Sequence, residues 1–521
     1  HTILDDGEVE KTLFMSGGKD FRPVAMDKDS GGNLFISDWV LVDYPNHGRG
    51  KIWRVSKLPI PEPDPQPAPE QPKRRTIKQF LSDRDPFVRH QGEMWLAKGN
   101  RKPFATRLSQ DEDPMVRLGA FLALKRMGAG KDRDLIRAAL RDESIEVRRM
   151  ALLWAGQALD VSLRPALDQV LTAGEVTPTL FKCYLAAVEM VNDHFIEEFK
   201  KRETNSKKVK RELEPGLLLK LARDSSFSPV VRAEAVKRLN TDEAMEFLYS
   251  AEESVLLAAI SKLAAITESV IIKQRFTDLA LDRGKSGKVR AEALLALSKQ
   301  AIEDPSALVS LLRDSDRSVA NEATRTLRNY LGDPMVKQAF TSLDKKSNGD
   351  PGQDAVVSMV MHGFSKDRPT TVDAWKNVAV HGGDPDRGSR VFRTTQSMCT
   401  LCHAVDGEGT KLGPDLGGIA QSITPEQIVQ AVLRPSDSFP PQYQAWNIYT
   451  TDGKVHTGLQ IDHQRGGAML LYTMDNYNRR FEADEVKNYE ASPYSLMPQG
   501  LENTMTANEF RDLIAYLSSL K

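Results

Sequence analysis

Between residues 77 and 345, apolar positions recur at spacings of three and four, which predicts helices with one buried face. These segments repeat one plan, in which a Leu precedes a short Asp-rich turn that leads into Val-Arg and an apolar helix. Arg89, Arg117 and Arg148 mark a period of about 30 residues, and degenerate copies follow. Asp, Ser and Pro before the Val are helix-start residues. The pattern predicts an α-solenoid of stacked helix pairs.

The repeats resemble short HEAT-like repeats, and their Val-Arg arginines allow two interpretations. The arginines either tie neighbouring turns together through ion pairs with the Asp-rich loops, or they form a row of binding groups. We expect the first role. Cys183 lies on an apolar helix face, where we expect a buried side chain rather than a reactive thiol.

The remaining chain follows other patterns. Residues 1–55 hold short β-type runs separated by Gly and Asp turns, and residues 443–490 alternate apolar and polar positions, which predicts a small β-meander. Residues 56–76 contain seven prolines and predict an extended linker. Residues 346–383 predict connecting helices, and residues 384–521 form a separate C-terminal domain that contains the β insertion.

Composition adds constraints on function. The 521 residues, enough for about three to four domains, include 71 basic and 72 acidic side chains. The resulting net charge of -1 opposes binding to nucleic acid, which needs a basic excess. The sequence has no apolar run that could span a membrane and no signal peptide before His1, so we expect a mature product or a fragment.

The segment from Cys399 to His403, with a second cysteine at Cys402, is typical of c-type haem attachment. Each thiol forms a thioether with one vinyl group of the porphyrin, so both must lie on one short turn. His403 can then give its Nε2 to the iron. A zinc knuckle would need two more ligands at matching spacing, whereas the third cysteine, Cys183, lies far upstream. A redox dithiol needs no following His. The motif therefore predicts one covalent haem c.

From Asp384 onward, the sequence resembles the class I cytochromes c. In that family a Gly and an aromatic residue on the first helix cross a Leu and a Tyr on the last helix. Gly388, Phe392, Leu513 and Tyr516 match these positions. Local start signals agree with helices here, because Asp-Pro, Thr-x-x-Gln and Thr-x-x-Glu sequences precede the three main apolar stretches.

The resemblance also implies the iron ligands and their support. The family uses a loop whose proline carbonyl accepts the Nδ1–H of the proximal histidine, and Pro414 matches that proline. Met497, on a loop before the last helix, matches the distal ligand opposite His403. Ligation by His and Met fills both axial positions and favours electron transfer. The other downstream candidates are Met469, Met474, Met505, His456 and His463.

Two further resemblances cover the rest of the chain. Residues 1–55 resemble the last blade of sugar-dehydrogenase-like or NHL-like β-propellers. The haem motif, the β insertion and the Met497 loop resemble haem-binding proteins of Planctomycetes and Verrucomicrobia, which join a propeller-type dehydrogenase, a HEAT-like region and a cytochrome in this order. The implied fold is mainly α: a HEAT-like α-solenoid, then an all-α cytochrome c domain with a small β insertion, after a short propeller-blade-like β segment.

We expect an electron-transfer protein without catalytic residues of its own, located in the periplasm or exported, because covalent haem attachment normally takes place outside the cytoplasmic membrane. Its partner would be a redox protein or a fused dehydrogenase domain. One alternative is that the chain is part of a quinoprotein-like sugar or alcohol dehydrogenase whose propeller passes electrons to the haem. Another is a scaffold that binds protein or polysaccharide while the haem senses redox state.

Overall fold

The structure, a computed structural model, divides into two units, His1–Met127 and Gly128–Lys521. The described residues are 2–3, 9–10, 23–29, 33–38, 51–56, 75–128, 132–192, 213–214, 216–346, 349–405, 407–410, 412–463, 468–472 and 478–521.

The described part of the first unit holds small antiparallel sheets and then helices. In the three-stranded sheet, β4 lies between β3 and β5 and buries Ile36. The side chain of Asp85 accepts a hydrogen bond from Phe87 N at 2.8 Å and begins α2, with a proline at the first helical position. Asp113 begins α4 in the same way through Met115 N. The elements are β1 Thr2–Ile3, β2 Val9–Glu10, β3 Pro23–Lys28, β4 Leu34–Asp38, β5 Lys51–Val55, α1 Ile77–Leu81, α2 Pro86–Leu96, α3 Lys102–Leu108 and α4 Pro114–Arg126.

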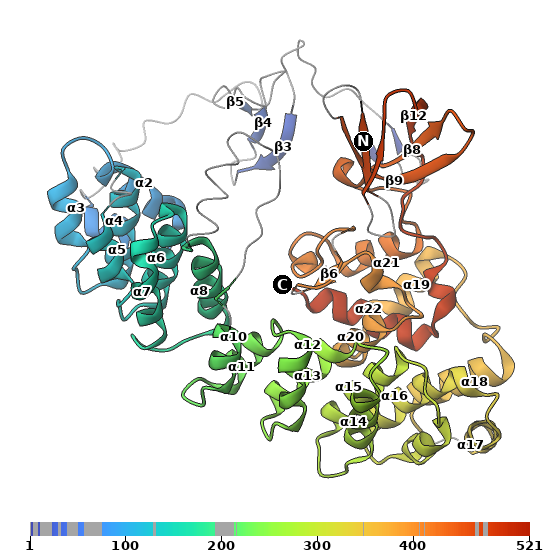
Figure 1. Cartoon of the computed structure of the whole chain (residues 1–521). Helices are drawn as coiled ribbons and strands as arrows, with labels where there is room; N and C mark the ends of the chain where they lie inside the picture. Colours follow the sequence, from blue (N-terminus) through green and yellow to red (C-terminus); the bar gives the residue numbers. More distant parts are fainter. Residues whose placement is uncertain are drawn as a thin grey trace. The chain divides into compact units, whose positions relative to one another are not determined.

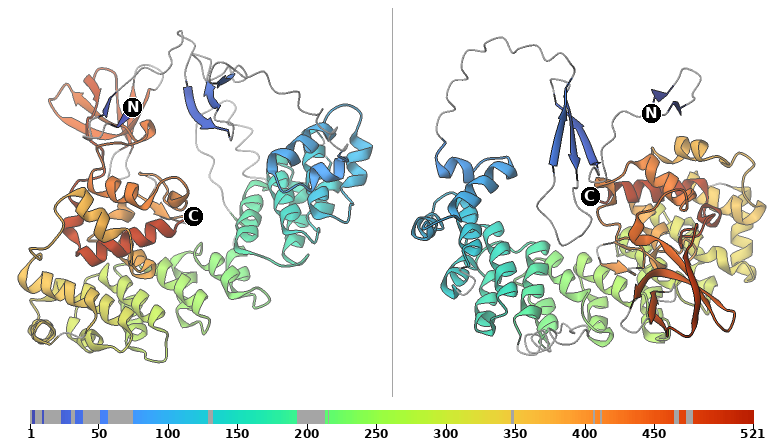
Figure 2. Two further views of the ribbon diagram at one scale, coloured as in Figure 1. Left: turned by 180° about the vertical axis from the view of Figure 1, so that it is seen from behind. Right: turned by 90° about the horizontal axis from the view of Figure 1, so that it is seen from above.

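In the second unit, successive helices of the repeat region lie side by side (Figure 1, Figure 2). Their facing sides bury apolar residues such as Val255, Phe276 and Leu294, as the spacing of three and four predicted. Within the described residues, no helix is both long and apolar enough to cross a membrane. The helices are α5 Arg133–Ala139, α6 Ile145–Ala158, α7 Arg164–Leu167, α8 Pro178–Met190, α10 Leu217–Arg223, α11 Pro229–Val236, α12 Thr241–Met245, α13 Glu253–Leu263, α14 Val270–Leu281, α15 Gly287–Ser298, α16 Arg317–Leu327, α17 Pro334–Lys345 and α18 Pro351–His362, with the 3-10 helix η4 Pro305–Arg313 before α16.

The Val-Arg arginines connect neighbouring turns, as expected. Their acceptors include many backbone carbonyls in addition to the carboxylates that the sequence predicted. Arg148 is fully buried and donates to the carbonyls of Val170 (3.1 Å) and Glu175 (2.8 Å). Arg290 forms the predicted type of ion pair and binds both carboxylate oxygens of Asp314 at 3.1 and 2.6 Å. Carbonyl acceptors are available at these turns because loop carbonyls, and the last carbonyls of a helix such as that of Val170, have no partner within a helix. Arg89 and Arg117 also donate to loop carbonyls.

The C-terminal part of the second unit is built on the crossing of α20 and α22. The ring centroids of Phe392 and Tyr516 lie 5.7 Å apart, and Gly388 faces the α22 backbone at Asp512. The predicted start signals are confirmed, because Asp384, Thr424 and Thr506 are the N-caps of α20, α21 and α22, the last two in capping boxes. The elements are α19 Val372–Ala379, α20 Pro385–Arg393, η6 Cys399–Leu401, β6 Ala404–Val405, β7 Glu408–Gly409, α21 Pro425–Leu433 and α22 Ala507–Ser519.

The β insertion forms a five-stranded antiparallel sheet (Figure 1). Four strands follow one another as the alternation predicted, and β12 returns to pair with β8, which the pattern did not predict. The sheet buries its own small core of Ile448, Met469, Leu471 and Phe481. The strands are β8 Ala445–Thr450, β9 Val455–His463, β10 Met469–Tyr472, β11 Asn478–Phe481 and β12 Val486–Ala491.

Buried ion pairs join the C-terminal helices to the repeat helices α15 and α16. Arg325 lies 2.9 Å from Glu322 and 3.0 Å from Glu509 of α22, and Arg328 lies 3.3 Å from the same Glu509 oxygen. Arg390 of α20 adds an ion pair with Glu322 at 3.5 Å. We call this set, which also includes Glu292 and Arg393, the arginine–glutamate network. Its charges lie on elements far apart in sequence, so the network links the two parts of the unit.

The closest approach of α20 and α22 requires glycine at position 388. A Cβ there would lie 1.9 Å from the carbonyl oxygen of Asp512 and 2.8 Å from Cβ of Tyr516. We expect Gly388→Ala to lower the local free energy of opening by about 3 kcal/mol or more, because two backbones must separate. Amide hydrogen exchange in α20 and α22 should become roughly a hundredfold faster.

Gly332→Ala is the matched control, because a Cβ at that position meets nothing within 4 Å. The same measurement should show unchanged exchange in α20 and α22. Wild-type protection of these helices in Gly388→Ala would contradict the crossing described above.

Candidate functional site

The candidate site begins on a tight turn after α20. Ser397, which is buried, donates its hydroxyl to Val391 O at 2.7 Å and closes the connection from the helix. Met398 follows with a left-handed backbone (φ 58°), which costs about 1 kcal/mol for a residue with a side chain. Cys399 then starts η6, and His403 N donates to Cys399 O at 2.9 Å. Both cysteines and the histidine therefore share one turn.

The two thiols of this turn are free and are not joined by a disulfide. Burial raises the pKa of Cys399 to about 11, and burial also raises the pKa of Cys402. Both groups are therefore protonated at neutral pH in the free chain. A dithiol that exchanges disulfides needs a lowered thiol pKa. The environment of these cysteines therefore argues against the redox-dithiol alternative.

The ring of His403 is oriented by the loop that contains Pro414. His403 Nδ1 lies 2.9 Å from Pro414 O, and Gly413 N donates to Cys402 O at 2.6 Å on the same loop. Burial lowers the pKa of His403, and the hydrogen bond with Pro414 opposes this shift only in part. A neutral ring that donates to a carbonyl carries its proton on Nδ1. Its Nε2 makes no hydrogen bond with the described residues, so this nitrogen keeps a free lone pair.

Met497 and Cys399 pack against one apolar core, which we call the C-terminal core. Both side chains are half-buried, and Leu416 from the Pro414 loop packs against the same core. The Met497 loop is held by Ser495, whose hydroxyl accepts from Met497 N at 3.1 Å. The buried members of the core are Trp375, Ala379, Val391, Phe392, Val405, Ile428, Val429, Val432, Leu433, Met505, Phe510, Leu513, Ile514 and Leu517.

The other candidate ligands that the structure describes belong either to the C-terminal core itself or to the five-stranded sheet. Met505 is 2% exposed and is itself part of the C-terminal core, where its thioether serves as packing. Met469 belongs to the separate core of the five-stranded sheet. His456 stacks near Phe481 of the same sheet, with ring centroids 5.0 Å apart. Met474 and the side chain of His463 lie outside the described residues.

One structural group near the site, Arg368, could not be assigned from the sequence. Arg368 donates to the backbone carbonyls of Met505 and Glu502, and its guanidinium lies over the Trp375 ring at 4.7 Å. It thus ties the connecting segment to the loop that precedes α22. Because its partners lie more than a hundred residues away, no local pattern signals this role. Cys183, expected to be buried, is half-buried on α8, and burial raises its pKa.

Gly413 allows the Pro414 loop to approach the His403 ring. A Cβ at this position would lie 2.8 Å from Cε1 and 2.9 Å from Nδ1 of that ring. We expect Gly413→Ala to break the hydrogen bond with Pro414, because overpacking costs about 1–3 kcal/mol and the bond contributes about 1 kcal/mol. Nitrogen-15 NMR of labelled histidine in the cofactor-free chain should show a fixed Nδ1–H tautomer in the wild type and a mixture in the variant.

Gly418→Ala is the control on the same loop, since its nearest contact would be an ordinary 3.7 Å. This variant should keep the wild-type tautomer. A mixed tautomer already present in the wild type would refute the orientation of His403 described above.

Comparison with known protein families matches residues 74–157 to HEAT repeats. The match covers the first copies of the repeat plan and confirms the predicted HEAT character there. A search among curated proteins found no match.

Proposed function

We propose that the chain carries one covalent haem c on Cys399 and Cys402 and transfers electrons through it. The observation that carries this proposal is the 2.9 Å contact between His403 Nδ1 and Pro414 O. It occupies one ring nitrogen and leaves Nε2 available, on the residue that directly follows two free thiols. A histidine that ligates a metal is commonly fixed in this way through its other nitrogen.

The donor set of the site fits a haem better than it fits zinc. A closed zinc site takes four protein ligands, whereas no group of three or more His, Cys, Asp and Glu side chains comes together among the residues that the structure describes. Histidine and methionine are a ligand pair that haem iron accepts, and Met497 packs against the same core as the motif residue Cys399. The proposed ligands are His403 and Met497, with Pro414 as the group that orients the histidine.

When bound, haem supplies an iron that gains and loses one electron. The chain's own residues fix the surroundings of that iron. Pro414 holds the His403 proton on Nδ1 and increases the basicity of Nε2. The C-terminal core, in which the ring centroids of Trp375 and Phe510 lie 4.7 Å apart, gives Cys399, Leu416 and Met497 an apolar surface to pack against. If both His403 and Met497 bound the iron, no ligand position would remain open for a substrate, which would favour electron transfer.

The proposal extends to place and partners. Covalent attachment of haem implies a periplasmic or exported protein, and the donor or acceptor would be a redox partner or a fused dehydrogenase domain. The repeat region would act as the scaffold of the haem domain, because the arginine–glutamate network joins the two through buried ion pairs. The chain itself would need no catalytic residues for this role.

Removal of the two motif cysteines should abolish covalent attachment. We expect the wild type, made together with a c-type haem attachment system, to keep one haem per chain after denaturation. The double variant Cys399→Ala/Cys402→Ala should keep none. Intact mass and the absorption of the denatured protein measure this.

Cys183→Ala is the matched control, because it removes the remaining cysteine of the chain, which lies away from the motif on α8. It should keep its haem. A wild-type chain that loses all haem on denaturation would refute covalent attachment, whatever the variants do.

Replacement of Met497 tests the distal ligand. We expect Met497→Leu to lose completely the weak far-red absorption band of methionine–iron ligation and to lower the reduction potential. Leucine keeps the volume of the side chain but has no sulfur donor. Met505→Leu, a similar change inside the C-terminal core, should keep the band. An unchanged spectrum in Met497→Leu would exclude Met497 as the ligand.

A further inference from the structure

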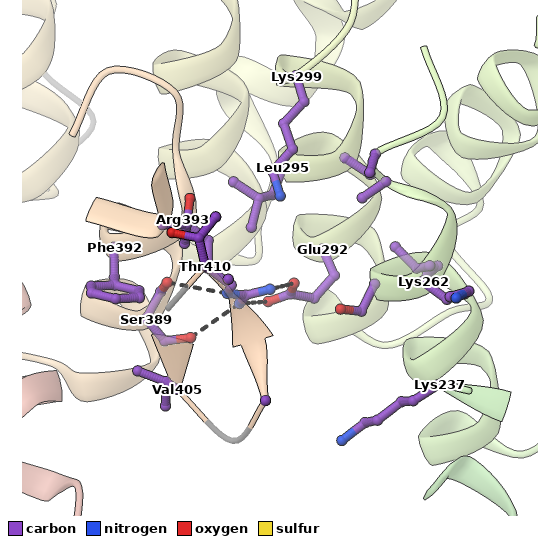
Figure 3. A pocket seen from close by; sticks show the side chains of 18 of the residues that line it. Lys237, Lys262, Glu292, Leu295, Lys299, Ser389, Phe392, Arg393, Val405 and Thr410 are labelled. Atoms are coloured by element: carbon purple, nitrogen blue, oxygen red, sulfur yellow. Dashed lines mark hydrogen bonds and ion pairs between the residues drawn. The ribbon is translucent and has the colours of Figure 1, made fainter. Parts of the chain in front are cut away.

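A hollow of about 720 Å³ lies between the repeat helices and the haem-motif segment of the second unit. One wall comes from α11, α13 and α15, and the other comes from α20, η6 and the β6–β7 hairpin (Figure 3). Thr400, which stands between the two motif cysteines, belongs to the second wall. Small-molecule sites in proteins have volumes of about 300–1,000 Å³, so the hollow is large enough for an organic ligand.

The floor of the hollow is a closed ion pair. Arg393 binds Glu292 through two contacts of 2.7 and 2.9 Å and also donates to the hydroxyl of Ser389 at 3.0 Å (Figure 3). Burial favours the protonated acid, but the charge of Arg393 outweighs it and lowers the pKa of Glu292. Both groups of the pair therefore stay charged, and their charges cancel. The sign of the electrostatic potential in the hollow then depends on the other lining residues.

The lining as a whole is basic. It contains five basic and two acidic side chains, which leaves a surplus of three positive charges in a protein whose net charge is -1. The second acid, Glu234, already has Lys237 and Arg238 at 3.2 Å each. Lys262 forms no ion pair with any residue that the structure describes. A basic concave site between low-dielectric walls concentrates anions.

The lining is also partly apolar. Ile260 and Leu295 come from the repeat wall, and Phe392 and Val405 come from the opposite wall. An inorganic anion gains nothing from contact with this apolar surface, whereas the carbon skeleton of an organic anion can bury it. Lysines at separate points of the lining, Lys237, Lys262 and Lys299, suit a ligand with more than one anionic group (Figure 3).

We propose that this hollow binds a small organic anion with two or more carboxylate groups. The carboxylates would pair with Lys237 and Lys262, and the carbon skeleton would lie against the apolar walls. The proposal does not depend on the haem, because the walls and charges belong to the chain itself.

Isothermal titration calorimetry of the full chain at low ionic strength, with citrate as the probe, tests the proposal. Acetate serves as the single-charge comparison. We expect saturable binding of citrate, and Lys237→Gln/Lys262→Gln should weaken it at least about tenfold, since two ion pairs with the ligand are lost. Acetate should give no saturable heat.

The control is Lys366→Gln/Lys487→Gln, which removes the same charge from exposed positions outside the hollow. Binding by this variant should stay within about twofold of the wild type. Equal weakening in both double variants, or no binding of citrate by the wild type, would overturn the proposal. Tighter binding of a hexaglutamate peptide than of citrate would also overturn it, in favour of an acidic protein segment.

Discussion

The second unit depends on a small number of charges that are buried between two groups of helices. Glu509 of α22 lies against Arg325 and Arg328, and Glu322 of α16 lies against Arg325 and Arg390. Such pairs add little net stability relative to apolar packing, but removal of one partner costs about 3–5 kcal/mol. An alternative arrangement of the C-terminal helices would leave buried charges without partners and would therefore be strongly destabilised. The ion pairs add much less to the stability of the observed arrangement. The same constraint holds α20 in place, and the turn with both cysteines follows directly from α20.

The arginine–glutamate network also explains why the haem motif and the basic hollow both involve the segment from α20 to η6. Arg393, at the end of α20, is bound to Glu292 on the repeat side, and a few residues later the chain reaches Cys399. The haem-motif turn therefore contributes Thr400 to the lining of the basic hollow. The polar side chains of Thr394 and Ser397 in this segment are buried, and their hydroxyls donate hydrogen bonds to the carbonyl of Val391 in the same segment.

Local chemistry explains what the sequence predicted well. Capping boxes at Thr424 and Thr506 involve residues three apart, so the pattern suffices. The position of Pro414 opposite His403 came from a family resemblance, and the structure has the expected contact. Long-range features had no such signal. The pairing of β12 with β8 and the ion pair between Arg325 and Glu509 each join segments that are far apart in the sequence. The sequence of a helix does not show whether one of its arginines faces water or a buried carboxylate.

The docked C-terminal helices change how the solenoid can come apart. In an open array of repeats, each repeat contacts only its neighbours, and unfolding can begin at either end. Here α22 binds the last repeats through Glu509, and Asn508 donates to Pro351 O at 2.8 Å at the start of α18. Fraying of that end then requires the C-terminal helices to leave as well. The last repeats and the C-terminal helices should therefore form one cooperative folding unit, whose loss would expose the cysteine turn and the repeat face together.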